Sequence, residues 1–219
     1  MHKFFRRLFA KRVKCDKGNI VNIPKHKNIK VKIKGTGNIV TVGDNITNDS
    51  KIRINIMGNN NKVNIGSSNL QNNIKLMIGF RGNIVNDATF QFGKNNHTQM
   101  TGYLLEEDGT SIIIGDNNLF SWNIEVRCSD SHTILDSDGN VINKAESITI
   151  GNGVWIGHDC TILKNTNIPD GCVIGTHTIV TKKFTEPNCL LVGIPAKIVK
   201  TNISWNHAHP NTWCKKQGV

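Results

Sequence analysis

The sequence predicts an all-β solenoid, because aliphatic residues recur every six positions near its C-terminal end. These residues are Ile150, Ile156, Ile162, Ile168, Ile174 and Val180. Glycine directly follows three of them, and a small or β-branched residue lies four positions after each of the first five. A strand repeats with period two and a helix with period 3.6, so a period of six indicates a short strand followed by a corner. We therefore expect a β-helix.

The spacing also predicts the cross-section of the solenoid. Three six-residue units would close a triangular coil of about 18 residues, with coils stacked about 4.8 Å apart. Positions upstream in the same phase are also apolar: Val126, Phe120, Ile114, Ile84, Ile78 and Val42. Asparagine is common at the expected corners, where it tolerates left-handed backbone. We expect one domain of about nine or ten coils over residues 18–192.

The segments on either side of the repeat are expected to form no core of their own. Residues 1–17 are basic, and Phe4, Phe5, Leu8, Phe9 and Val13 can share one face of a short N-terminal helix. Two roles are open for this segment: it caps the first coil, or it lies on an anionic membrane surface. Residues 193–219 form a tail, in which the role of the His207-Ala-His209 sequence is unassigned.

Composition limits the class of protein and of partner. The formal net charge is +11, but the basic residues are diffuse outside the N-terminal run and form no nucleic-acid motif. An acidic glycan is therefore the expected polyanionic partner. No apolar run is long enough to span a membrane, and no CxxC pair occurs among the six cysteines. We expect a cytoplasmic protein, with a possible peripheral contact at the inner face of an anionic membrane.

The repeat breaks at His132, which takes a position that is aliphatic in the neighbouring units. A polar stretch with turn residues follows, and we expect it to leave the solenoid as a loop over about 133–147. A histidine at the base of such a loop is suitably placed for a general base. Asp130 either orients the imidazole or binds backbone amides at the corner, and both readings are open.

The sequence around this break contains more specific motifs. It reads FSWNIEVRCSDSHTILD, then ITIGNGVWIGHDCTILKNTNIPDGCVIGTHTIVTKKF, and finally CLLVGIPAKIVKTNISW. These stretches, roughly residues 112–205, resemble the hexapeptide-repeat O-acetyltransferases of bacterial capsule and lipopolysaccharide, including the polysialic acid O-acetyltransferases. The resemblance implies a left-handed parallel β-helix, a homotrimer, acetyl-CoA as co-substrate and a glycan hydroxyl as acceptor. Separately, the sequence predicts no metal, because it lacks the closely spaced histidine pair of a zinc site.

The resemblance also implies roles for individual residues. His132 matches the histidine that removes the hydroxyl proton, with Asp130 beside it in sequence. Trp155 is expected to point outward into the active-site groove or against a neighbouring subunit, and Trp122 is a weaker candidate for acceptor binding. The residues expected along coenzyme A are Gly157, Gly175, Thr176, Thr181, Lys182, Lys183, Lys197 and Lys200. The spacing between the lysine pair and GIP is one residue longer than in galactoside acetyltransferases, which leaves the place of Lys183 open.

Two other functions compete with this one. The first is an N-acyltransferase acting on an amino-sugar nucleotide, and the second is a non-catalytic solenoid that serves as scaffold or glycan-binding protein. The interruption of the repeat at residues 129–132 argues against the non-catalytic solenoid, because a passive scaffold needs no exposed histidine at that place. The γ-class carbonic anhydrases share the repeat, but the histidine pair of their zinc site is absent from this sequence.

Overall fold

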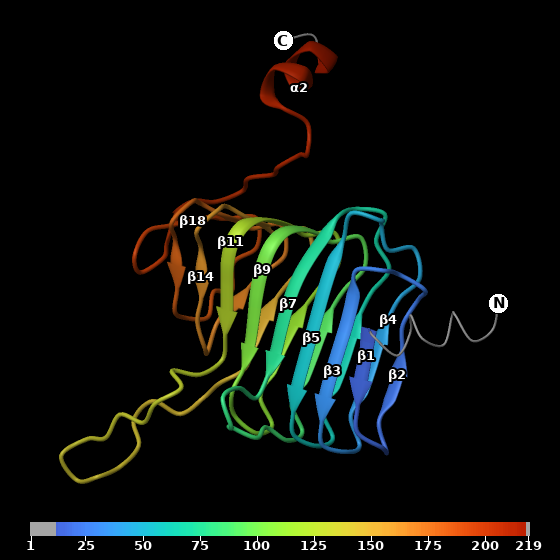
Figure 1. The fold of residues 1–219 in the computed structure, drawn as a ribbon. Helices are drawn as coiled ribbons and strands as arrows, with labels where there is room; N and C mark the ends of the chain where they lie inside the picture. The colour runs from blue at the N-terminus through green and yellow to red at the C-terminus, as the bar shows by residue number, and fades with distance from the viewer. Residues whose placement is uncertain (1–11, 218–219) are drawn as a thin grey trace.

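The computed structural model describes residues 12–217 (Figure 1). The helical part of the predicted N-terminal segment, with Phe4, Phe5, Leu8 and Phe9, lies outside the described residues. Val13 does not continue that helix, because Val13–Cys15 form strand β1, which pairs in parallel with β3. Within residues 12–217, the first strand of the solenoid therefore begins at Val13.

The chain forms a left-handed parallel β-helix, as the resemblance implied. The first sheet contains β1, β3 (Ile29–Lys34), β5 (Lys51–Met57), β7 (Asn72–Ile78), β9 (His97–Leu105), β11 (Leu119–Arg127), β13 (Trp155–Ile156), β16 (Val173–Ile174), β18 (Leu190–Val192) and β19 (Lys197–Lys200). The second contains β2 (Ile20–Asn22), β4 (Ile39–Val42), β6 (Lys62–Ile65), β8 (Thr89–Phe92), β10 (Ser111–Ile114), β12 (Ile148–Ile150) and β15 (Asn167–Ile168). Strands β14 (Thr161–Ile162) and β17 (Ile179–Val180) extend the second half of β11.

Coil length differs between the two halves of the solenoid. In the C-terminal half Trp155 pairs with Val173, so that one coil contains three units of the repeat, as the period of six predicts. Upstream, paired residues on successive coils are further apart in the sequence, as for Ile52 and Ile74. The separation is larger again between β7 and β9. These longer coils each contain one long strand and one short strand instead of three equal sides. The predicted coil of about 18 residues is therefore wrong upstream, and Ile84, predicted to point inward, is 61% exposed.

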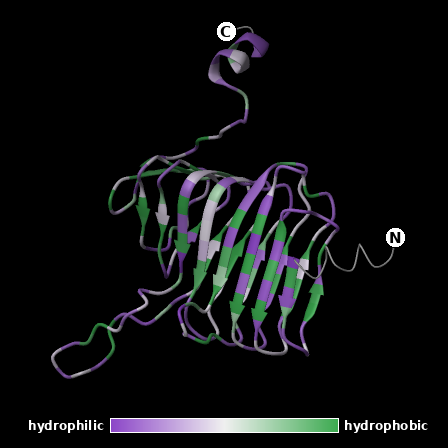
Figure 2. Ribbon diagram, viewed as in Figure 1, coloured by the Kyte–Doolittle hydropathy of each residue, from purple (hydrophilic) through white to green (hydrophobic). Residues whose placement is uncertain are grey.

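The core consists of residues that alternate along the strands. In β3 every second residue is buried, with the lysines facing outward, and Figure 2 shows this alternation along the first sheet. Near the middle of the solenoid the core is aromatic, and the rings of Phe90 and Tyr103 lie 4.9 Å apart. Four cysteines, Cys128, Cys160, Cys172 and Cys189, are buried, and all six are free thiols. These four cysteines thus pack as small apolar residues, whereas Cys15 and Cys214 are exposed.

Asparagine closes the corners in two ways. Many corner asparagines adopt left-handed backbone, among them Asn60 with a φ of 57° and Asn117 with a φ of 59°. Others are buried and bind successive coils together: Asn61 donates through Nδ2 to Oδ1 of Asn38 at 2.9 Å and to the carbonyl of Val85 at 2.8 Å. Stacked asparagines therefore satisfy backbone groups that the corners leave without partners in the sheets.

Two segments leave the solenoid. Residues 133–147 project as the expected loop, drawn in yellow in Figure 1, with a single bridge between Leu135 and Val141. After the last coil, β19 turns back antiparallel to β18, and helix α2 (Pro210–Gln217) stands away from the coils with no buried residue. Among the described residues, no helix is long and apolar enough to cross a membrane.

Candidate functional site

His132 lies at the base of the projecting loop, exposed to solvent, just after β11 ends. The backbone that holds it is fixed to the wall by a buried carboxylate. Arg127 forms an ion pair with Glu106 at 3.0 Å, and Ser131 donates its hydroxyl to the same carboxylate at 2.8 Å. Ser131 is also in left-handed backbone, with a φ of 64°. Glu106 and Arg127 were missed by the sequence analysis, because their role depends on two coils stacking.

A hollow of about 390 Å³ opens beside His132. It is lined by the corner that carries His132, by the returning strand of the loop with Asn143 and Lys144, and by the turn around Asp108. Most of these lining groups are polar, so the hollow suits a hydroxyl-rich ligand better than an apolar one.

Asp130 does not contact the imidazole of His132 within this chain. Its carboxylate pairs with the ammonium of Lys164 and accepts a hydrogen bond from Nδ2 of Asn143 at 3.0 Å. The same Asn143 amide donates to the carbonyl of His132 at 2.7 Å. Lys164 is the largest cause of the lowered pKa of Asp130. Asp130 thus ties the two ends of the loop to the next coil, a role that neither sequence-based reading included.

Replacing Asp130 with asparagine is expected to loosen this loop, because Lys164 loses its ion pair. Limited proteolysis should cut within residues 133–147 faster than in the wild type, whereas Asp44→Asn, a distant exposed control, should leave the cleavage rate unchanged. The wild-type loop should be protected above the ordinary aspartate pKa and lose protection as the pH falls through the lowered pKa of Asp130. Equal cleavage rates in Asp130→Asn and the wild type would refute this role.

Trp155 points outward from β13, and its ring lies 5.9 Å from the ring of Trp205 in the C-terminal tail. The indole of Trp205 donates to the carbonyl of Gly153 at 2.6 Å, and the ring centre of His207 lies 4.9 Å from that of Trp205. Trp155 keeps 37% of its surface exposed. The tail therefore covers part of the tryptophan that the sequence analysis placed in the groove. Trp205 was not foreseen, since the two tryptophans are far apart in the sequence.

The glycines assigned to coenzyme A have a packing role that can be read directly from the structure. A Cβ at Gly157 would lie 2.8 Å from the backbone nitrogen of Thr176, and one at Gly175 would lie 2.7 Å from Cγ1 of Val192. Any larger residue would push neighbouring coils apart.

The polar residues assigned to coenzyme A lie at the C-terminal end of the solenoid. All of them are exposed: Thr176, Thr181, Lys182, Lys183, Lys197 and Lys200. Lys182 also lies 5.2 Å from the ring of Phe184. Lys197 and Lys200 lie on β19, opposite Val192 and Leu190. Cations thus gather on the last coil and the strand after it, where a phosphate-bearing ligand would find them.

His132 and Trp155 do not share a hollow in the single chain. Trp155 pairs with Leu119, the first residue of β11, whereas His132 follows the last residue, Arg127. The full length of β11 therefore separates them. Trp122, near the middle of β11, is 60% exposed, and its ring lies 6.4 Å from that of His158.

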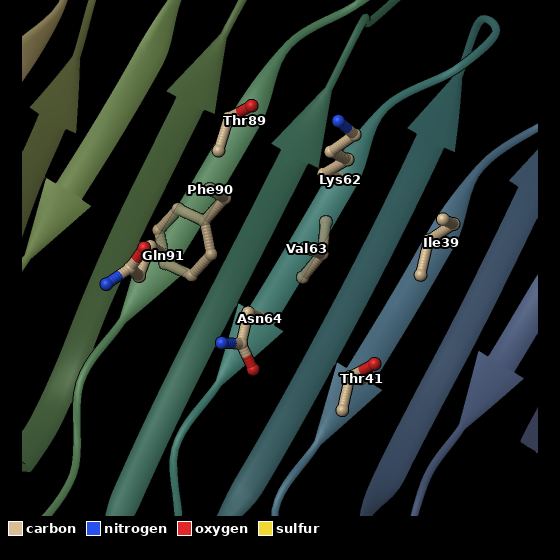
Figure 3. Close-up of a pocket in the computed structure, with 8 residues that line it drawn as sticks. All are labelled: Ile39, Thr41, Lys62, Val63, Asn64, Thr89, Phe90 and Gln91. Carbon is tan, nitrogen blue, oxygen red and sulfur yellow. The ribbon is translucent and has the colours of Figure 1, made fainter.

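A second hollow, of about 250 Å³, lies on the second sheet. Figure 3 shows that side chains of β4, β6 and β8 line it, including Thr41, Asn64 and Gln91. It contains no histidine, cysteine or carboxylate that could act as a base or nucleophile. The hollow beside His132 combines an exposed imidazole with polar lining groups, and we take the region around His132 as the candidate site.

Comparison with known proteins decides the family. No protein-family model matches the chain. However, a polysialic acid O-acetyltransferase of Neisseria meningitidis is 37% identical over 190 residues, which cover 79% of this chain and 86% of the relative. The chain belongs to the hexapeptide-repeat O-acetyltransferases. The predicted family and reaction class are thereby confirmed.

Two further proteins are similar to this chain over most of their length, and the second of them is named as an acetyltransferase. An uncharacterized 24.8 kDa protein from the cps region of Klebsiella pneumoniae is 30% identical over 196 residues, covering 87% of this chain and 83% of that protein. The crystal structure of the polySia-specific acetyltransferase NeuO superposes with a TM-score of 0.58 at 25% identity, covering 88% of this chain and 100% of NeuO.

Proposed function

We propose that this O-acetyltransferase moves an acetyl group from acetyl-CoA to a hydroxyl of an acidic bacterial surface glycan. The observation that carries the proposal is the 37% identity to an enzyme named for polysialic acid, over 86% of that enzyme. The net charge of +11 supports an acidic acceptor, because positive charge raises the local concentration of polyanions. Capsular polysaccharide and lipopolysaccharide precursors are the acceptor classes that fit.

His132 is the proposed general base. Its imidazole takes the proton of the sugar hydroxyl as the oxygen attacks the thioester carbonyl, and the tetrahedral intermediate then expels the sulfur of coenzyme A. The protonated imidazole returns its proton to that sulfur, so no proton is gained or lost. Burial raises the pKa of Cys128, Cys160 and Cys172, which argues against an acyl-cysteine intermediate. Acetyl transfer is therefore proposed to be direct.

We assign the lysines at the C-terminal end to the phosphates of coenzyme A. Replacing both Lys182 and Lys197 with alanine should raise the KM for acetyl-CoA about tenfold and change kcat much less, because phosphate binding contributes equally to ground state and transition state. Lys51→Ala with Lys62→Ala, at the other end of the solenoid, is the matched control. Steady-state kinetics with varied acetyl-CoA measures both constants. An unchanged KM for acetyl-CoA in the Lys182→Ala, Lys197→Ala variant would rule out the assignment of these lysines to the phosphates.

A homotrimer with sites between adjacent subunits would bring Trp155 of one subunit toward His132 of the next. The separation of these residues along a single chain supports this arrangement. Mixed trimers of His132→Ala and Trp155→Ala subunits should then recover activity that neither homotrimer has, since some interfaces contain both intact residues. Light scattering gives the trimer mass. No recovery in the mixed trimers would place both residues in the same subunit's site.

The acceptor is tested by measuring thiol release from acetyl-CoA with several glycans and the full-length protein. Polysialic acid and a uronic acid polymer should stimulate release, and a neutral dextran should not. Stimulation should fall with added salt, because electrostatic attraction is screened. Stimulation by dextran alone would refute the acidic acceptor, and stimulation by an amino-sugar nucleotide alone would favour the N-acyltransferase alternative.

Because acidic surface glycans are assembled at the inner membrane surface, we place the reaction in the cytoplasm.

A further inference from the structure

One corner of the solenoid gathers two histidines and an aspartate that the proposed acetyl transfer does not use, next in sequence to Gly157 and Thr176, which are expected along coenzyme A. The pairs Trp122–Asn123, His158–Asp159 and Thr176–His177 occupy the same corner on three successive coils. Backbone hydrogen bonds join them, from Asp159 N to Trp122 O at 3.1 Å and from His177 N to His158 O at 3.0 Å. Asp159 and His177 both adopt left-handed backbone, with φ of 56°. Coil stacking thus fixes the backbone that carries all three ionisable side chains.

The separations within this cluster are longer than hydrogen bonds and somewhat longer than those between the ligands of a bound zinc ion. Oδ2 of Asp159 lies 3.6 Å from Nε2 of His158 and 3.7 Å from Nε2 of His177. Both separations exceed the ordinary limit of about 3.2 Å for an N–H···O hydrogen bond. Ligand atoms about 2.0–2.1 Å from a tetrahedral zinc ion are about 3.3–3.4 Å apart. The three ligand atoms lie within 4.8 Å of one another, so a small side-chain movement would close the site.

Neighbouring polar groups orient two of the three ligands. Thr176 Oγ1 lies 3.2 Å from Nδ1 of His158, and a proton on Nδ1 donated to this hydroxyl leaves the lone pair of Nε2 directed at the cluster. Asn123 Nδ2 donates to Oδ1 of Asp159, so that Oδ2 remains free to face both imidazoles. This division of roles is the one expected for metal ligands and their supporting hydrogen bonds.

We propose that His158, Asp159 and His177 bind a divalent transition-metal ion of the zinc class, with at least one coordination position open to solvent. Two imidazoles and a carboxylate are a ligand set that zinc accepts. The side chains of His158 and His177 are 46% and 68% exposed, so an ion reaches the site directly. This departs from the sequence-based expectation of no metal. That expectation relied on spacing within one stretch, whereas these histidines lie on different coils and meet only because the coils stack.

Cobalt binding tests this site independently of acetyl transfer. Full-length protein without an affinity tag is stripped with a chelator and titrated with Co²⁺, whose visible absorption reports coordination by nitrogen and oxygen ligands. We expect one ion per chain, displaced by Zn²⁺. His158→Gln and His177→Asn should each weaken binding at least tenfold, and asparagine keeps the left-handed backbone at position 177. The matched control is His209→Gln, which changes a histidine of the C-terminal tail outside the proposed metal site.

Two further measurements complete the test. Asn123→Ala should weaken binding about tenfold, as loss of a supporting hydrogen bond does at other metal sites. Zn²⁺ should raise the melting temperature of the wild type and of His209→Gln, but not of His158→Gln. The proposal is overturned if the wild type gives no cobalt absorption, if His158→Gln binds as tightly as the wild type, or if His209→Gln abolishes binding.

Discussion

Replacing His132 with alanine is expected to lower the rate of acetyl transfer about 10²–10⁴-fold, which corresponds to about 3–5 kcal/mol of activation free energy. A sugar hydroxyl is too weak an acid to attack a thioester without a base, and His132 is the exposed imidazole at the hollow beside the loop. Because the side chain is exposed, its loss should leave the fold and the oligomeric state intact. Thiol release from acetyl-CoA with a saturating glycan measures the rate.

Two companion variants make this result specific. His132→Asn keeps a polar side chain but removes the basic nitrogen, so it should be nearly as inactive as His132→Ala. His209→Ala, in the exposed tail, should retain the wild-type rate. Activity of His132→Ala within threefold of the wild type would exclude His132 as the base.

Replacing Asn61 with alanine is expected to lower the free energy of unfolding by about 2–5 kcal/mol. Asn61 is completely buried, donates to the carbonyl of Val85 at 2.8 Å and accepts from the backbone nitrogen of Ala88 at 2.9 Å. Alanine would leave both backbone groups buried without a partner, and each such group costs about 1–3 kcal/mol. Urea unfolding followed by circular dichroism measures the change.

The matched control is Asn64→Ala, three positions further along. Asn64 is exposed on β6, where Figure 3 shows it at the surface of the second sheet. Its replacement should change the free energy of unfolding by less than about 0.5 kcal/mol. If the two variants proved equally stable, the buried asparagines would not be holding the coils together.

The C-terminal coils were predictable because each side contributes one inward residue at a fixed spacing, as Ile156, Ile162 and Ile168 do. Upstream the inward residues alternate within long strands, as in β5 and β7. Coil length there depends on where the long strands pair, which a fixed period cannot give. Ile84 matched the phase by coincidence and lies at the surface. The overall fold was thus predictable, and the register of its first half was not.

In the candidate site, too, one part was predictable from the sequence and the other was not. His132 was predictable because it interrupts a regular pattern. Its supporting residues were not, since Asp130 meets Lys164 on a later coil and Trp155 meets Trp205 only where the tail returns. Such contacts depend on which coils stack and on the path of the chain after the last coil. A repeat reveals its own interruptions, but it does not reveal which distant residues contact them.

The central claim is that this protein forms an acetyl ester on an acidic glycan, and the product itself tests it most directly. Purified full-length protein is incubated with polysialic acid and acetyl-CoA that carries a ¹³C-labelled acetyl group, and the glycan is analysed by NMR before and after mild alkali. The account predicts a labelled acetyl signal that alkali removes and that His132→Ala fails to produce. A labelled acetyl group that resists alkali would indicate an amide, and the absence of label from both polysialic acid and a uronic acid polymer treated in the same way would mean no transfer to an acidic glycan. Either result would contradict the account.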